Sequence, residues 1–78
     1  MHRETETLQL VRMRDMVRGG LVRELRIGAG LSLSEVARAV GVTPGAVHHW
    51  ERGIRLPQGQ AAVRYALLIC SLESLARR

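Results

Sequence analysis

The chain has 78 residues, 46% of them hydrophobic, and its 12 arginines, 7 acidic residues and complete lack of lysine give a formal net charge of +5. That length predicts one small domain of marginal stability, which a second subunit would support. A single tryptophan, a single tyrosine and no phenylalanine exclude a stacking platform for single-stranded nucleic acids, while one cysteine and three histidines exclude an intramolecular disulfide and a four-ligand zinc site.

The hydrophobic spacing predicts an all-α chain, because no run of residues alternates as a strand would. Residues 1–19 are predicted to be an N-terminal extension and residues 20–78 the main domain. The extension is expected to be helical, since hydrophobic residues recur at helical spacing: Leu10, Met13, Val17 and Leu21. Gly19-Gly20 predicts either a break or a kinked continuation, because each glycine costs a helix interior up to about 1 kcal/mol relative to alanine.

The first helix of the main domain is predicted to begin at Leu21 and to stop at the glycine-rich residues 28–30. Ser32 and Glu35 have the spacing of a capping box, in which the serine side chain and the glutamate side chain each bind a backbone N–H at the start of a helix. A second helix is therefore expected to begin there. Gly41, at the end of its hydrophobic stripe, is expected to form the turn that follows.

The third helix of the main domain is predicted to begin at Thr43-Pro44, because threonine caps a helix and proline is tolerated at its first position. Gly53 ends it, so the helix-turn-helix occupies about residues 32–52. C-terminal helices are predicted over residues 60–78, where a helix to about Cys70 is followed either by its own continuation or by a fifth helix. The residues of this helix expected to point inward are Ala62, Tyr65, Ala66 and Ile69.

Four residues of the two central helices have the spacing that close helix packing requires. Ala37 is small enough for the next helix to cross above it, and Gly41 permits the positive φ of a tight turn. Val47 and Trp50, three residues apart, then pack down onto the preceding helix. An αα-corner with no role in DNA binding is the alternative interpretation of these four residues.

With their neighbours, these residues resemble the helix-turn-helix of the Cro/phage-repressor family, also called XRE-like, from Leu21 to about Cys70. The resemblance also rests on three short segments: Leu25-Arg26, Gly30-Leu31-Ser32 and Trp50-Glu51-Arg52-Gly53. It implies a compact lambda-repressor-like domain of four to five helices that binds double-stranded DNA. It also implies that Arg26 and Glu51 form a partly buried, mainly structural ion pair.

The residues expected to read DNA bases lie on the exposed face of the third helix of the main domain: Pro44, Gly45, His48, His49 and Arg52. The resemblance implies base reading mainly at Pro44, Gly45 and His49. Because the first two have no side-chain hydrogen-bonding group, readout shifts towards His48, His49 and Arg52. His49 is expected to contact a base, His48 a base or the backbone, and Arg52 either a guanine or a phosphate.

Phosphate contacts are expected at the starts of the two central helices, where backbone N–H groups and the helix dipole favour an anion, and from arginines around the motif. The residues assigned to them are Ser32, Ser34, Arg38, Thr43 and Arg55. Members of the family often have a glutamine where this chain has Leu33, so the resemblance does not carry the phosphate contact of that glutamine over to this chain.

Leucines near the C-terminus exceed what one small core needs, and three are expected to form a homodimer interface or else to cover the core: Leu68, Leu72 and Leu75. Residues 1–19 have several interpretations: an extra helix packed on the domain, an arm for a dimer or protein partner, a basic tail on DNA, or a partly ordered solvated extension.

The most direct functional interpretation is a sequence-specific double-stranded DNA-binding transcriptional regulator, a small phage- or prophage-type Cro or repressor that acts as a dimer on a near-palindromic operator. One alternative is an antitoxin-like protein that binds a partner protein as well as its operator. Another is an accessory DNA-binding factor in recombination or excision. No enzymatic activity, cofactor, metal or membrane association is expected, and the location is expected to be the cytoplasm of a bacterium or phage-infected host cell.

Overall fold

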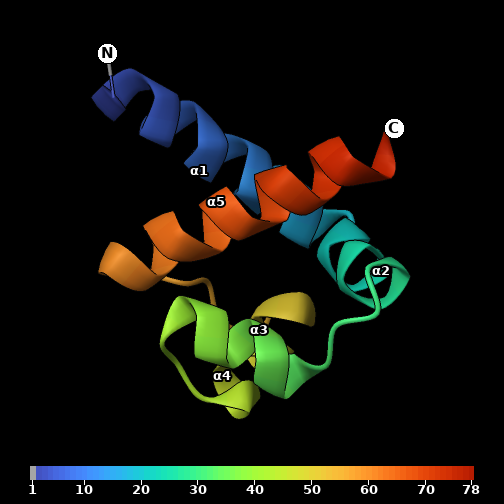
Figure 1. Ribbon diagram of the computed structural model, residues 1–78. Coiled ribbons are helices and arrows are strands. Elements are labelled where there is room, and N and C mark those ends of the chain that lie inside the picture. The colour runs from blue at the N-terminus through green and yellow to red at the C-terminus, as the bar shows by residue number, and fades with distance from the viewer. Residues whose placement is uncertain (1) are drawn as a thin grey trace.

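The computed structural model describes residues 2–78, which form five helices and no strand (Figure 1). The helices are α1 (His2–Arg18), α2 (Leu21–Gly28), α3 (Leu33–Val40), α4 (Pro44–Glu51) and α5 (Gly59–Ala76). α5 crosses the middle of the molecule, with α1 on one side of it and α3 and α4 on the other, and α2 lies beside its C-terminal part. The compact all-α fold predicted from the sequence is confirmed.

The two glycines after α1 break the helix. α1 ends at Arg18, and the Gly19 N–H still donates to the Asp15 carbonyl at 3.0 Å. Gly20 then has φ 74°, a left-handed conformation that side chains disfavour, and α2 begins at the next residue. Of the two outcomes expected for Gly19-Gly20, the chain therefore takes the break, and α1 and α2 run in different directions.

Helix α1 contributes directly to the core and packs on α5 and α2. Met13 and Met16 are fully buried, and Val17 is nearly so. Outside the core, Arg12 forms an ion pair with Glu73 of α5, to which Arg77 also donates at 3.4 Å. Among the interpretations of the N-terminal extension, a helix packed on the domain is the one that residues 2–18 adopt.

Each helix of the helix-turn-helix begins at the cap predicted from the sequence, α3 at Ser32 and α4 at Thr43. The Ser32 hydroxyl accepts a hydrogen bond from the Glu35 N–H at 3.0 Å, and the Glu35 carboxylate accepts from the Ser32 N–H at 2.9 Å. The Thr43 hydroxyl accepts from the Ala46 N–H at 3.2 Å. Between the two helices, Gly41 has φ 86° and donates to the Ala37 carbonyl. Each cap satisfies N–H groups that a helix start leaves without an intrahelical partner.

The core under the helix-turn-helix is built on α5, which is one continuous helix through residue 76. All four residues expected to point inward from it are buried: Ala62, Tyr65, Ala66 and Ile69. Tyr65, Ala66 and Ile69 share one core cluster with buried residues of α3 and α4, namely Val36, Ala37, Val40, Val47 and Trp50. The rings of Trp50 and Tyr65 are 4.8 Å apart at a tilt of 54°, a favourable arrangement for two aromatic side chains. Residues 71–76 therefore continue the helix rather than forming a fifth one.

We expect Gly41→Ala to destabilise the fold by about 1–2 kcal/mol, because an L side chain disfavours the left-handed conformation. An added Cβ would also lie 3.3 Å from Nη1 of Arg64. Gly28→Ala is the matched control, since Gly28 lies in α2 at a φ outside the left-handed range and has no atom within 4 Å of an added Cβ. Urea unfolding should show a lower midpoint for the Gly41 variant and an unchanged or higher one for the control. Equal midpoints would contradict this role for Gly41.

Candidate nucleic-acid interface

One face of α4 is open to solvent and carries the residues assigned to base reading. Val47, Trp50 and Glu51 point inward and are buried. Because neighbouring helical residues differ by about 100° in direction, the opposite face presents the exposed set. All five residues assigned to base reading are exposed: Pro44, Gly45, His48, His49 and Arg52. Gly45 places backbone rather than a side chain on this face, which allows close approach of a ligand.

Two hollows border this face of α4. On one side a hollow of about 510 Å³ is lined by His49 and Arg55, together with residues of the loop before α5. On the other side a hollow of about 480 Å³ is lined by His48 and Arg52, together with residues of α2 and α3. The two adjacent histidines therefore line different hollows, His49 the first and His48 the second, and their ring centres are 6.3 Å apart.

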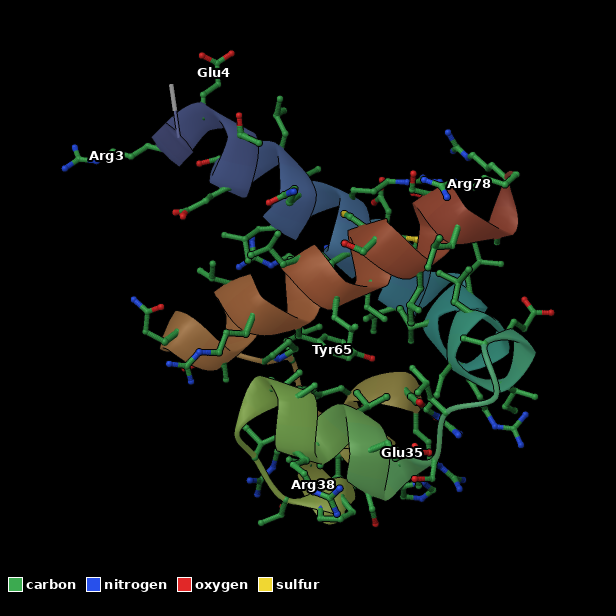
Figure 2. All side chains as sticks on the ribbon, in the orientation of Figure 1. Arg3, Glu4, Glu35, Arg38, Tyr65 and Arg78 are labelled. Carbon is green, nitrogen blue, oxygen red and sulfur yellow. The ribbon has the colours of Figure 1, made fainter. Side chains whose placement is uncertain are left out.

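The residues assigned to phosphate contacts are all exposed: Ser32, Ser34, Arg38, Thr43 and Arg55. Ser32, Ser34 and Thr43 lie at the starts of α3 and α4, whereas Arg38 is in the last turn of α3 and Arg55 is in the loop after α4. The hydroxyls of Ser32 and Thr43 accept from the backbone in their caps and keep their protons for donation. Glu35, labelled with Arg38 in Figure 2, has its pKa lowered by hydrogen bonds from the Ser32 backbone and side chain. Its carboxylate therefore stays charged near the start of α3, beside the proposed phosphate contacts.

An ion pair holds α2 against α4. Nε of Arg26 lies 2.5 Å from one carboxylate oxygen of Glu51, and Nη2 lies 3.1 Å from the other. Nη1 of Arg26 donates to the Leu31 carbonyl at 3.0 Å. The side chains are 12% and 3% exposed, and the hydrogen bond to Glu51 raises the pKa of Arg26. The structure therefore brings together the two residues that the family resemblance pairs, with the two-bond geometry that strengthens such contacts.

The buried hydroxyl of Tyr65 makes no hydrogen bond to any described residue. Burial, followed by the charge of Glu51, raises the pKa of this phenol. The phenol therefore stays neutral next to the Arg26–Glu51 pair, and its ring packs against the ring of Trp50.

The three C-terminal leucines have different positions. Leu72 is only 8% exposed and belongs to the core, and Leu68 is half-buried against it. Leu75 is 56% exposed. α5 continues to residue 76 and packs on α2, and Leu72 lies on the buried side of this helix. Leu72 therefore covers the core, the second of the two roles left open by the sequence, and Leu75 is the exposed member of the three.

The sequence did not predict the burial of one core residue, Met16, or the place of one arginine, Arg23, beside the candidate site. Met16 is fully buried although it was outside the predicted stripe, whereas Leu21, which was in that stripe, is 43% exposed. Arg23 lines the same hollow as His48 and Arg52. The available signals were the spacing of Met16 three residues after Met13, and that of Arg23 one helical turn before Arg26.

Neither a metal site nor a membrane helix is found in the part of the chain that the structure describes. No group of three or more His, Cys, Asp or Glu side chains in residues 2–78 is arranged to hold a metal ion. None of the helices in this range has both the length and the hydrophobicity required to cross a membrane.

Comparison with known proteins agrees with this geometry. A family model described as a helix-turn-helix domain matches residues 19–77, which run from the glycines before α2 to the end of α5. No curated protein matches the chain, and neither does any solved structure. Domains of the matched family bind DNA and are typically not enzymes. Since the match covers well over half of the chain, the protein belongs to the helix-turn-helix domain family, of the Cro/phage-repressor (XRE-like) type.

Proposed function

We propose that this protein is a sequence-specific transcriptional regulator that places α4 in the major groove of double-stranded DNA, acting as a small Cro or repressor of phage or prophage type. The observation that carries the proposal is the open face of α4, bordered on both sides by basic hollows. His49 and Arg52 offer donors to base edges there, and Gly45 permits close backbone approach. In this proposal the chain works in the cytoplasm of a bacterium or a phage-infected host cell.

The charge of the chain supports a polyanionic duplex as the ligand. The formal net charge is +5, and two exposed arginines lie near the helix-turn-helix: Arg38 in the last turn of α3 and Arg55 in the loop after α4. Backbone N–H groups at a helix start attract phosphate, and arginine side chains release counterions from DNA when they bind it. The proposed phosphate contacts therefore flank the proposed base contacts, as a groove-reading helix requires.

The proposed active form is a homodimer on a near-palindromic operator, because one recognition helix reads too few base pairs to select a site. Support for a second subunit comes from an apolar hollow of about 340 Å³ between α2 and α5, lined by Leu25, Leu72, Leu75 and Ala76 among others. Leu75 is the exposed residue through which a partner chain would make contact.

Selection of bound duplexes from a random pool, followed by stoichiometry on the selected duplexes, tests this function. We expect a near-palindrome bound by two chains, with a slope of log affinity against log salt of about −5 if a dimer makes about six phosphate contacts. His49→Ala should reduce discrimination between selected and shuffled duplexes by about 1–3 kcal/mol. Ser74→Ala, on the exposed end of α5, is the control and should leave discrimination unchanged. No enriched sequence, or a flat salt dependence, would contradict the proposal.

A second candidate function follows from the outer face of α1, where Leu8 is 62% exposed and Val11 is 50% exposed. These residues are three apart and share one side of the helix, which is a feature of protein-binding surfaces. An antitoxin-like protein would bind a partner there and use α4 on its own operator. Capture of a defined protein by wild type, lost in Leu8→Glu, would favour this function over a simple repressor.

A further inference from the structure

The hollow on the His48 side of α4 is lined in part by two arginines from outside the helix-turn-helix, both on α2. It is lined by Arg23 and Arg26 of α2, Leu33 of α3, and His48, Glu51 and Arg52 at the end of α4. Three helices therefore meet around a space of about 480 Å³ that opens beside the proposed recognition face. Arg23 is exposed, one turn before Arg26 on α2.

The lining of this hollow is positive after its internal ion pair is taken into account. The single carboxylate, that of Glu51, is 3% exposed and is bound by two nitrogens of Arg26. No ion pair of residues 2–78 includes Arg23 or Arg52. The net positive charge of the hollow therefore comes from the guanidinium groups of Arg23 and Arg52, whereas the charges of Arg26 and Glu51 offset each other.

The hollow also adjoins the start of α3. Leu33 is the first residue of α3, and a helix leaves the N–H groups of its first residues without intrahelical partners. The capping box uses the N–H groups of Ser32 and Glu35, which leaves those of Leu33 and Ser34 for an external acceptor. The Leu33 side chain offers no polar atom, so the side-chain donors at this edge come from α2 and the end of α4.

We propose that Arg23 is a DNA-contacting residue, which binds a phosphate of the duplex backbone together with Arg52 while α4 lies in the groove. The inference rests on the function proposed above and adds a contact from α2, outside the helix-turn-helix. Arg23 fixes the position of α4 on the duplex and carries no base preference, because phosphate contacts are the same for every sequence.

Salt-dependent binding of three variants tests the proposal. Affinities are measured over a range of salt concentrations for a selected duplex and a shuffled one, using wild type, Arg23→Gln, Arg23→Lys and Arg78→Gln. Arg78 is the matched control: it is exposed, carries the same charge, and lies at the end of α5 on the opposite side of the molecule from α4 (Figure 2). Circular dichroism melting checks that each variant folds as wild type does.

We expect Arg23→Gln to reduce the magnitude of the log–log salt slope by about 0.9 for each bound chain and to weaken both duplexes by the same factor. Arg23→Lys should keep the wild-type slope, because lysine retains the charge that releases the counterion. Equal slopes for Arg23→Gln and Arg78→Gln would overturn the proposal, as would a loss confined to the selected duplex, which indicates a base contact. If wild type binds no duplex at all, the proposed function fails and Arg23 loses its role with it.

Discussion

Replacing Glu51 with alanine is expected to destabilise the protein by about 3 kcal/mol or more, because the change leaves the charge of Arg26 buried without its partner. Both side chains are largely inaccessible to solvent, and two hydrogen bonds join them. The remaining bond from Arg26 to the Leu31 carbonyl is too little to replace a carboxylate. In a domain of this size the loss corresponds to a fall of about 12 °C or more in Tm, which thermal melting measures directly.

The exposed pair between Arg12 and Glu73 provides the control for this prediction. The Arg12 side chain is 46% exposed, so Glu73→Ala should cost about 1 kcal/mol or less. The double variant Arg26→Met with Glu51→Leu should recover most of the lost stability, since a hydrophobic pair leaves no buried charge. Equal Tm values for the Glu51→Ala and Glu73→Ala variants would contradict a structural role for the buried pair.

Replacing Met16 with alanine should cost about 3 kcal/mol, a loss typical of a fully buried side chain that leaves a cavity when truncated. Met16 lies outside the segment that matches the helix-turn-helix family, yet it is buried in the same core as Trp50 and Tyr65. A chain that begins at residue 19 should accordingly fail to unfold cooperatively, because it exposes the surface of α5 that α1 covers.

Leu8→Ala is the matched control, since Leu8 is on the same helix but 62% exposed, and its loss should change stability by about 0.5 kcal/mol or less. Urea unfolding of the two variants, followed by circular dichroism, separates the core role of Met16 from a general effect on α1. Similar stabilities for the two variants, or cooperative unfolding of the shortened chain, would show that α1 is dispensable.

Local signals in the sequence were sufficient for the helix boundaries around the candidate site. The capping box at Ser32 and Glu35, the Thr43 cap and the turn at Gly41 all depend on residues within four positions of one another. Such interactions are set by side-chain chemistry and backbone sterics alone. The inward direction of Val47 and Trp50 followed from the same local periodicity, and so did the exposure of the opposite face of α4.

Other features depended on contacts between distant parts of the chain. The glycine pair Gly19-Gly20 was compatible with either a break or a kink, and the observed break is accompanied by burial of Met13 and Met16 of α1 and Val22 of α2 in one core. Leu72 was compatible with either a core or an interface, and its burial in the cluster shared by α1, α2, α3, α4 and α5 places it in the core. A hydrophobic stripe identifies residues that need cover, but not the element that covers them.

Short-range rules of capping, glycine conformation and helical period were enough to predict the helices of the main domain, the turn between α3 and α4, and the open face of α4. That α1 completes the core, and that Arg23 meets His48 and Arg52 around one hollow, became apparent only from the packing of the helices. These relations join residues far apart in the chain, and their geometry is set by the crossing of packed helices, which no local pattern specifies.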